Sequence, residues 1–414
     1  MLTAHEKTLS LFQAALGIQD PWYISDYKFS AEENKLSLQV DFKRGATFPC
    51  PDCGVEGAEP YDTKERTWRH LNFFEHRTDI TARVPRVKCT ASDCGKVKTI
   101  SVPWAAKGSR FTLLFEAYVM TLVAHMPVKA VADMVGEYDQ RLWTILTRNV
   151  NEAMSREDYS DVTEIGLDET ASKRGHNYIT TVVDLDEKRV IFATEGKDAA
   201  TVDKFVDHLK EHNGDPKNIE AVSSDMSKAF IAGVTKHFPN AHLVFDRFHI
   251  MKLMGEAIDE VRRAEVKSND TLKKTRYLWL KNPSKLSVKQ TEWVSSLSKL
   301  NLKTAKAYQI RLALAEFFQQ EDYDSAEYYL KRWYYWATHS RIEPVINVAK
   351  TIKAHWNGVM AWYHKRISNG ILEGFNSLIQ AAKAKARGYR STKNLITMVY
   401  LIAGKLRFNL VLPT

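Results

Sequence analysis

The chain has 414 residues, enough for roughly two to four domains, and 44% of them are hydrophobic, which supports packed cores and excludes a disordered protein. Its 59 Lys and Arg against 50 Asp and Glu give a formal net charge of +9, which favours an anionic partner only modestly. No apolar run approaches the length of a membrane span, and the N-terminus lacks a signal-like apolar segment. We therefore expect a soluble, unexported protein with no membrane partner.

The first hundred residues predict a small β-rich region around a cysteine cluster. Helically spaced apolar residues predict a helix over residues 5–17, and strand-like runs follow at 22–29 and 35–42. All 4 cysteines of the chain come next, in pairs spaced C-x2-C and C-x4-C: Cys50, Cys53, Cys89 and Cys94. Paired thiolates suit tetrahedral zinc, and four of them leave no open coordination position, so we expect a structural zinc finger rather than four free thiols. The basic residues around it fit either a solvated surface or a phosphate-contacting finger.

A linker at residues 103–110 leads into a helical region. Apolar residues at helical spacing predict helices from Phe111, from Val128 and from about Asp139, with a break at Gly136. This is the outline of a helix-turn-helix, whose second helix lies in the major groove of DNA. Four side chains of that helix would then face DNA: Gln140, Arg141, Thr144 and Arg148. An ordinary three-helix packing unit is the alternative interpretation.

From Val162 the pattern changes to strands alternating with helices. We predict helices at about 200–211 and 229–234, and strands at 162–167, 178–184, 189–194, 219–224 and 241–245. This order fits an RNase H-like mixed sheet. Three strands end in an aspartate, at Asp168, Asp225 and Asp246, and such a sheet would bring Asp168 and Asp225 side by side. The alternative for each aspartate is a turn residue or a helix cap.

The chain is helical after His249, so residues 256–365 are interpreted as an all-α insertion. Aromatic side chains at helical spacing there favour a core over base stacking: Trp279, Trp293, Tyr308, Tyr328, Tyr329, Trp333, Tyr334, Trp336, Trp356 and Trp362.

The next helix is predicted to begin at Ser368 or Asn369, to carry Glu373 in its first turn and to stop at Gly388. Helical spacing from Glu373 places an amide and basic series along one side: Asn376 or Ser377, Gln380, Lys383 or Ala384, and Arg387. An acid followed by amides and cations suits a phosphate-rich partner. A solvated helix face would have the same composition, and Glu373 would also simply favour the helix dipole.

Asp168, Asp225 and Glu373 together form a ligand set for hard divalent cations. Carboxylate oxygens suit magnesium and manganese, so we expect two Mg²⁺ ions in the site, with Mn²⁺ as an alternative. In such a site one ion activates the attacking oxygen and the other stabilises the leaving oxygen of an in-line phosphoryl displacement. We expect Asp168 to bridge the ions, while Asp225 and Glu373 hold one each.

Several motifs follow one another along the chain: Ile165-Gly166-Leu167-Asp168-Glu169, Lys173-Arg174-Gly175-His176, Ser224-Asp225-Met226-Ser227, Asp246-Arg247-Phe248-His249, Ser368-Asn369-Gly370 with Glu373-Gly374-Phe375-Asn376, and Ala386-Arg387-Gly388-Tyr389-Arg390. Together with the finger and the helix-turn-helix, they resemble the DDE transposases of bacterial insertion sequences, and more narrowly the ISL3 family. The resemblance covers almost the whole chain in the family's order. One departure is Thr170, where the family often has an aromatic residue.

The resemblance implies a multidomain α/β protein in which an all-α insertion interrupts an RNase H-like catalytic core, behind a zinc-binding finger and a helix-turn-helix domain. The implied segments are 1–105 for the finger region, 106–157 for the helix-turn-helix, 158–255 and 366–414 for the two parts of the core, and 256–365 for the insertion. Asp168, Asp225 and Glu373 would be the catalytic triad. Residues expected near the site are Arg174, His176, His249 and Asn376, and the expected DNA contacts include Lys383, Arg387 and Arg390.

The implied activity is metal-dependent cleavage and transfer of DNA strands by an enzyme that binds the terminal inverted repeats of its element and the target DNA. Both ends of an element must be paired before cutting, so we expect a homodimer or larger assembly on DNA. The expected location is the bacterial cytoplasm, in association with the nucleoid. Two rivals are a non-catalytic DNA-binding regulator and a nuclease of the same fold that cuts without joining.

Overall fold

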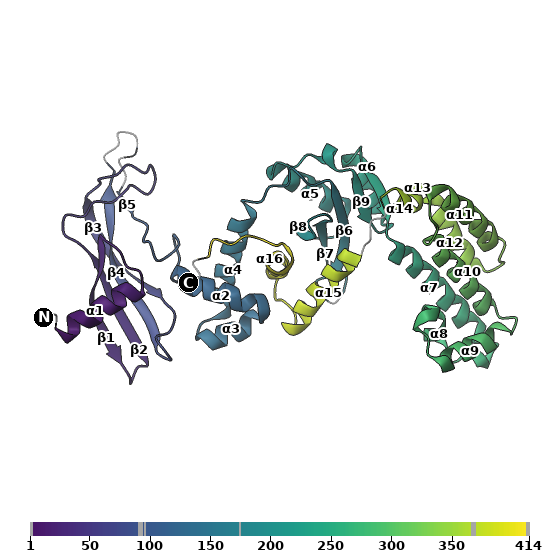
Figure 1. Ribbon diagram of the computed structural model, residues 1–414, viewed down its shortest axis with the longest axis horizontal. Coiled ribbons are helices and arrows are strands. Elements are labelled where there is room, and N and C mark those ends of the chain that lie inside the picture. The colour runs from purple at the N-terminus through teal and green to yellow at the C-terminus, as the bar shows by residue number, and fades with distance from the viewer. Residues whose placement is uncertain (1–2, 90–93, 95–96, 174, 366–369, 411–414) are drawn as a thin grey trace. The chain divides into compact units, whose positions relative to one another are not determined.

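The structure is a computed structural model of the chain that describes residues 3–89, 94, 97–173, 175–365 and 370–410 (Figure 1). It forms two compact units, one made of Met1–Asn149 with Phe408–Thr414 and the other of Val150–Arg407. The boundary between them falls within helix α4 (Asp139–Met154). Each unit contains a hydrophobic core of its own.

A five-stranded sheet forms the β-rich part of the first unit. Its strand order is β1-β2-β4-β3, and β5 pairs with β4. Alternation along β2 buries Leu36, Leu38 and Val40, which join Trp22 and Trp68 in the core. The predicted first helix and first two strands are confirmed, and the elements are α1 (Ala4–Ala15), β1 (Trp22–Ser30), β2 (Lys35–Phe42), β3 (Pro60–Arg69), β4 (Arg77–Lys88) and β5 (Val97–Thr99).

Three helices follow in the first unit: α2 (Leu113–His125), α3 (Val128–Val135) and α4. The hydroxyl of Thr112 caps α2 by accepting a hydrogen bond from the Phe115 N–H at 3.3 Å. Gly136 ends α3 with a φ of 67°, a left-handed conformation that glycine adopts without strain. Buried apolar residues of α4 complete the packing: Leu142, Ile145 and Leu146. The predicted helix-turn-helix is therefore present.

A second five-stranded sheet lies in the other unit, with the order β10-β9-β6-β7-β8. The strands β6, β9 and β10 are parallel, whereas β7 is antiparallel to both of its neighbours. This is the RNase H-like mixed sheet that the element order predicts. Its elements are β6 (Glu164–Ala171), β7 (Tyr178–Asp184), β8 (Arg189–Glu195), α5 (Ala199–Glu211), β9 (Ala221–Ser224), α6 (Lys228–His237) and β10 (His242–Phe245).

Helices hold the second sheet in place. Val202 and Phe205 of α5 and Phe230 of α6 share one buried cluster with strand residues such as Val182 and Val222. Near the C-terminus, α16 (Thr392–Ala403) packs on β8, where the Ala193 N–H donates to the Tyr400 hydroxyl at 2.9 Å.

One predicted strand end is wrong. The sequence pattern ended the first strand of the core before Asp168, but β6 continues to Ala171. The reason is its antiparallel partner, because β7 keeps pairing with β6 as far as Ala171 opposite Tyr178, whereas the parallel pairing to β9 stops at Gly166 opposite Ser223.

A long helical region follows β10 and packs around one large core. Its first helix, α7 (Arg247–Glu265), begins directly after β10, so the boundary expected between residues 255 and 256 falls inside one helix. The other helices are α8 (Arg276–Leu280), α9 (Val288–Ser298), α10 (Lys303–Phe317), α11 (Tyr323–Thr338), α12 (Glu343–Ala354), α13 (Trp356–Met360) and α14 (Trp362–Lys365), with short 3-10 turns η1 (Pro216–Asn218), η2 (Asp270–Leu272) and η3 (Pro283–Lys285) elsewhere in this unit.

The aromatic residues of this region divide into two groups. Trp279, Tyr308 and Trp333 are at most 2% exposed, which confirms the core interpretation for them. Tyr328 and Trp336, by contrast, are 65% and 40% exposed on α11. Helical spacing alone therefore identified the buried face only in part.

Helix α15 (Gly370–Lys385) carries Glu373 in its first turn, as predicted. The expected caps at Ser368 and Asn369 lie outside the described residues. At the other end, Gly388 has a φ of 93° and donates its N–H to the Lys383 carbonyl at 2.8 Å. The predicted glycine stop is therefore confirmed.

Candidate active site and metal centres

Three aspartates lie at equivalent positions at the carboxyl ends of three neighbouring parallel strands, just beyond the last β6–β9 pair, Gly166 opposite Ser223. In the β6–β9 pair the partners Glu164 and Ala221 differ by 57 in residue number, and Asp168 and Asp225 differ by the same amount. The β9–β10 register carries the same level on to Asp246, which follows β10 as Asp225 follows β9. Side chains at one register level of a parallel sheet share a face and lie side by side, so this edge gathers carboxylates.

Packing brings α15 onto the strand that carries Asp168. A Cβ built at Gly166 would lie 2.8 Å from Cδ2 of Leu372, which is only 2% exposed. Only a residue without a side chain therefore lets Leu372 rest on β6 at this point. Because Glu373 follows Leu372 directly, this contact delivers the third carboxylate to the region of the sheet edge.

One face of α15 then follows β6 toward its end. The Asn376 amide donates to Asp168 Oδ2 at 2.5 Å, and Gln380 Nε2 donates to Thr170 Oγ1 at 2.7 Å. Lys383 Nζ donates to the Ala171 carbonyl at 2.6 Å. Helical spacing from Glu373 thus identified a real face of the helix, and its described partners are strand atoms.

Burial and neighbouring charges change the pKa of Asp168. Burial raises the pKa of Asp168 from 3.8 to about 6, and the charges of Asp225 and Asp246 act in the same direction. The Glu169 N–H, which donates to Asp168 Oδ1 at 2.7 Å, and the nearby His249 oppose this rise in pKa. The folded protein therefore holds a carboxyl whose ionisation is costly unless a cation is added.

These residues fit divalent cations. Each described aspartate oxygen that accepts an N–H bond keeps further lone pairs, as at Asp225, whose Oδ1 accepts from the Ser227 N–H at 2.9 Å. Glu373 is exposed and lines a cavity together with Asp246. A hard cation bound here would neutralise the negative charge of these neighbouring carboxylates, including Asp168, whose pKa is raised.

The residues expected near the site have different surroundings. Asn376 contacts Asp168, and His249 lies close enough to affect its pKa, with His249 Nδ1 at 3.6 Å from Asp246 Oδ2. His176 is exposed in the connection between β6 and β7. Arg174 lies outside the described residues. Asn376 and His249 are therefore part of the cluster in this structure.

Sequence reasoning did not select two residues that shape this site. Asp246 is 7% exposed and accepts the Phe248 N–H at 2.8 Å, which caps α7. Gly166 admits Leu372. The available signals were a strand-end aspartate like Asp225 and a glycine inside a buried strand. Gln380, which the helical spacing from Glu373 did select, bonds to β6.

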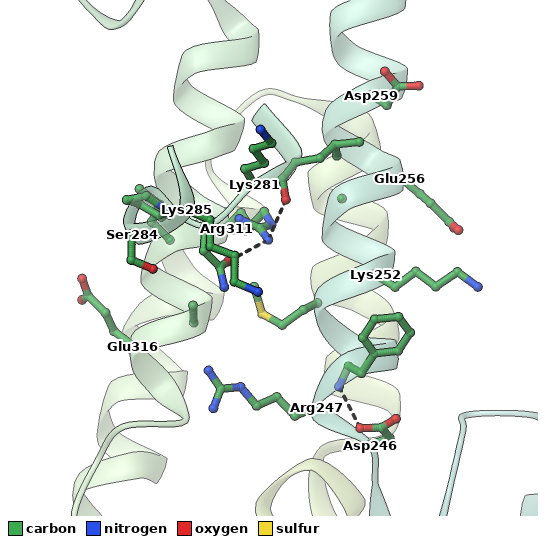
Figure 2. A pocket seen from close by; sticks show the side chains of 18 of the residues that line it. Asp246, Arg247, Lys252, Glu256, Asp259, Lys281, Ser284, Lys285, Arg311 and Glu316 are labelled. Carbon is green, nitrogen blue, oxygen red and sulfur yellow. Dashed lines mark hydrogen bonds between the residues drawn. The ribbon is translucent and has the colours of Figure 1, made fainter. Parts of the chain in front are cut away.

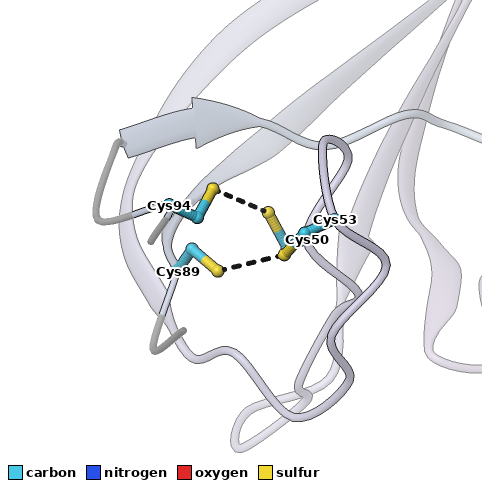
Figure 3. Close-up of side chains that lie close together, drawn as sticks. All are labelled: Cys50, Cys53, Cys89 and Cys94. Atoms are coloured by element: carbon cyan, nitrogen blue, oxygen red, sulfur yellow. Dashed lines mark hydrogen bonds between the residues drawn. The ribbon is translucent and has the colours of Figure 1, made fainter. Parts of the chain in front are cut away.

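The four cysteines form a compact cluster in the first unit (Figure 3). Their sulfur atoms all lie within 4.8 Å of one another, with Cys53 to Cys89 at 3.3 Å and Cys50 to Cys94 at 3.9 Å. Four thiolates around one zinc ion, each at about 2.3 Å, would be separated by similar distances. The backbone N–H groups of Cys53 and Asp52 lower the pKa of Cys50 to about 7, which favours the thiolate. The cluster therefore fits a structural zinc ion.

The four side chains of α4 that are predicted to contact DNA differ in their exposure to solvent. Gln140, Arg141 and Thr144 are exposed on α4. Arg148 is half-buried, and its guanidinium donates to Glu116, a carboxylate that is 3% exposed. A contact between Arg148 and DNA would have to compete with that buried ion pair, so it stays a prediction.

Glu137 joins the sheet of the first unit to its helices. This carboxylate is 2% exposed and has Arg141 Nη1 at 2.9 Å, Arg77 Nη1 at 3.3 Å and Arg69 Nε at 3.9 Å. These arginines come from β3, β4 and α4. A buried carboxylate with three cationic partners orients Arg141 at the start of the second helix.

Comparisons with known proteins agree with this order of parts. Residues 46–94 match the family described as the zinc-finger of transposase IS204/IS1001/IS1096/IS1165, and residues 100–150 match the helix-turn-helix domain of transposase family ISL3. Residues 165–399 match the ISL3 DDE family, described as Transposase. In the part of the chain that the structure describes, no helix has the length and apolar character required to cross a membrane.

Two similar proteins extend over most of the chain. The transposase for insertion sequence element IS1557 of Mycobacterium tuberculosis is 26% identical over 438 residues, covering 95% of each chain. The transposase for insertion sequence element IS1001 of Bordetella parapertussis is 27% identical over 349 residues, covering 82% of this chain and 85% of that protein.

Fold, sites and matches define a DDE transposase, an enzyme of the class that cleaves DNA strands and transfers them to new positions. The chain belongs to the ISL3 family of insertion-sequence transposases. The expected resemblance, fold class and enzyme class are thereby confirmed.

Proposed function

We propose that Asp168, Asp225 and Glu373 are the catalytic triad and hold two Mg²⁺ ions, for which Mn²⁺ can substitute. The observation that carries this proposal is the common register of Asp168 and Asp225 on adjacent parallel strands, together with the anchoring of the Glu373 helix on β6. The regulator alternative leaves this convergence of carboxylates without a purpose. When bound, the cations would activate the attacking oxygen and stabilise the leaving oxygen of the phosphodiester.

The protein's own residues would prepare the site for that chemistry. Asp168 is held on one side by the Glu169 N–H and on the other by the Asn376 amide, so its carboxylate cannot rotate freely. The bond from Asn376 also fixes α15, and therefore Glu373, relative to the strand. These contacts fix the orientation of Asp168 and the position of the Glu373 helix before DNA arrives. Bound cations would draw the triad oxygens closer together, because in this structure they do not all lie within 4.8 Å of one another.

The reaction that we propose has two steps at each element end. Water attacks the phosphodiester at the junction and releases a 3′-hydroxyl, and this hydroxyl then attacks a phosphodiester of the target DNA. We infer that the helix-turn-helix and the finger recognise the terminal inverted repeats, with Gln140, Arg141 and Thr144 facing the DNA. Pairing of two ends calls for at least a homodimer on DNA, in association with the nucleoid.

The domain limits are part of the same proposal. We assign residues 1–105 to the finger region, 106–157 to the helix-turn-helix, 158–255 and 366–414 to the catalytic core, and 256–365 to the insertion. The continuity of α7 (Arg247–Glu265) favours moving the start of the insertion to about Arg247.

The triad is tested with the full-length protein and a DNA duplex ending in the element's inverted repeats. Asp225→Asn and Glu373→Gln are each expected to lower cleavage and joining by at least about a thousand-fold in Mg²⁺, while DNA affinity stays within about two-fold. Asp207→Asn is the matched control, because Asp207 is an exposed aspartate on α5. Cleavage and joining at the wild-type rate by either triad variant would refute the assignment, and cleavage without joined products in the wild type would favour the nuclease alternative.

A further inference from the structure

A large cavity extends from the carboxylate region into the helical insertion (Figure 2). Its volume is about 1260 Å³, and Asp246 and Glu373 line it together with residues of α7 and α10 and the segment at residues 280–285. One cavity is lined both by Glu373, a proposed catalytic carboxylate, and by helices of the insertion. A substrate that extends from the active site into this cavity would therefore contact the insertion, and the charges of the helical wall indicate what kind of substrate fits.

Arg311 on α10 is the unusual residue of this wall. It is 7% exposed, and its Nη2 donates to the Leu280 carbonyl and to Asn282 Oδ1, both at 3.3 Å. Its Nε and Nη1 are buried and have no hydrogen-bond partner among the described residues. A buried guanidinium with two unpartnered nitrogens, which carry three N–H groups, is costly, and burial lowers the pKa of Arg311. Figure 2 places this side chain in the cavity, near Lys281.

The wall has an excess of cations that no carboxylate neutralises. Among the described residues, Arg247, Lys252, Lys285 and Arg311 line the cavity with no carboxylate in ion-pair distance. Of the acids on the same wall, Asp259 is shared by three arginines, Glu316 accepts the Tyr329 hydroxyl at 2.8 Å, and Glu256 has no ion pair with a described residue. Lys and Arg side chains still outnumber Asp and Glu around the cavity, so the wall is positive on balance, and a planar guanidinium with two unpartnered nitrogens matches the oxygens of a phosphate.

We propose that Arg311 binds a backbone phosphate of the DNA strand that occupies the active site, so that the helical insertion holds the strand beside the carboxylates. The proposal rests on the proposed function for the identity of the strand. The oxygens of a phosphodiester accept hydrogen bonds from the unpartnered Nε and Nη1, and the continuity of the cavity with Glu373 favours a polymer over a separate small anion. The cations Arg247 and Lys252 at the active-site end extend the same positive wall.

The experiment measures DNA binding by fluorescence anisotropy in the full-length protein, without added Mg²⁺, so that cleavage does not enter. The probe is a duplex with one inverted repeat and flanking DNA, titrated at several KCl concentrations. Arg311→Gln is expected to raise Kd about ten-fold or more and to lower the slope of log Kd against log salt by about one. Arg332→Gln, an exposed arginine of α11 that does not line the cavity, removes the same charge and is expected to change Kd less than about three-fold.

A scan of single uncharged methylphosphonate linkages across the cleavage site identifies the phosphate. One position is expected to weaken binding by the wild type and to have no effect on Arg311→Gln, because the two changes remove the same contact. Arg311→Met is the second variant, since replacing an unpaired buried cation by a packed apolar side chain should preserve the fold. Thermal unfolding checks the fold of each variant.

Several results would overturn the proposal. Unchanged affinity and salt slope in a folded Arg311 variant would do so, as would additive effects at every methylphosphonate position. Loss of the fold in both variants would make Arg311 a structural residue. Displacement of the DNA by inorganic phosphate at about the concentration of the DNA itself would assign the site to a free anion. These outcomes are independent of the triad, because a protein that binds this DNA through Arg311 and fails to cleave it would refute only the proposed function.

Discussion

The cysteine cluster and the carboxylate cluster are two metal centres of different construction. The four thiols come from two short loops of one sheet, and their sulfur atoms already converge within 4.8 Å. The carboxylates come from β6, from the end of β9 and from α15, which are separated by long stretches of chain. A local cluster is a property of the loops that carry it, whereas a dispersed cluster depends on the packing of the whole second unit.

The two centres also differ in what the protein contributes before a metal binds. Backbone N–H groups lower the pKa of Cys50 to about 7, which moves this thiol toward its metal-binding form, whereas burial raises the pKa of Cys94. Burial raises the pKa of Asp168 to about 6, which moves this carboxyl away from its metal-binding form. Because the four sulfur atoms already lie within 4.8 Å of one another, the first centre is expected to act as part of the fold, and the second to bind its ions more weakly and exchangeably.

The largest effect is expected from removing a thiol. Cys89→Ser should release the zinc ion and cost the first unit most of its stability, on the order of 10 kcal/mol at pH 7. Zinc content by atomic absorption and calorimetric unfolding of the full-length protein would measure this. Glu56→Gln, at an exposed residue in the segment that carries Cys50 and Cys53, is the control and should retain zinc. A Cys89→Ser protein with one zinc per chain and unchanged unfolding would remove the distinction between the two centres.

The next effect is a pH dependence at the carboxylate centre. Without Mg²⁺, the unfolded chain releases the Asp168 proton near pH 3.8, but the folded protein keeps it until about pH 6. The free energy of unfolding therefore falls as the pH rises through this window, by at most about 3 kcal/mol, and then stays low. Mg²⁺ should offset this loss, so it should raise Tm clearly at pH 7.5 and little at pH 5.

Asp168→Asn provides the matched comparison for that measurement. It should remove the loss of stability between pH 4 and pH 6 and should reduce the effect of Mg²⁺ on Tm at pH 7.5. Equal stabilisation by Mg²⁺ at pH 5 and pH 7.5 in the wild type would show that Asp168 does not control cation binding.

A smaller effect is expected where α15 contacts β6. Gly166→Ala places a Cβ 2.8 Å from Leu372, so it should cost about 1–3 kcal/mol and lower the cleavage rate by displacing Glu373. Leu372→Ala makes room for that Cβ. The double variant should therefore be more stable than the sum of the two single changes predicts, as measured by denaturant unfolding. Additive costs would mean that this contact does not position the helix.

The smallest effect separates two basic residues of the α15 region. Lys383 donates to the Ala171 carbonyl, whereas Arg387 is exposed. Lys383→Met should cost about 1 kcal/mol of stability and leave the salt dependence of DNA binding nearly unchanged. Arg387→Met should leave stability unchanged and lower the salt slope by about one. The reverse pattern would return Lys383 to the DNA contacts and make Arg387 a structural residue.

Much of the fold followed from local patterns. The spacing of Cys50, Cys53, Cys89 and Cys94 predicted their cluster, and hydrophobic periodicity predicted the helix-turn-helix and the succession of strands and helices along the core. The extent of β6 was missed, because its length depends on pairing with β7. The exposure of Tyr328 was also missed, since helical spacing does not say which face of an aromatic helix is covered.

The sequence by itself determined which residues are available for chemistry: four thiols at ligand spacing, strand-end aspartates, and an acid in the first turn of a late helix. Those features depend on short-range order, which a few neighbouring residues specify. The tertiary structure decided which of them meet. Strand register aligned Asp168 with Asp225 and Asp246, a missing Cβ at Gly166 admitted Leu372, and burial left Nε and Nη1 of Arg311 without hydrogen-bond partners among the described residues. Each of these depends on contacts between distant segments, which only the packed chain creates.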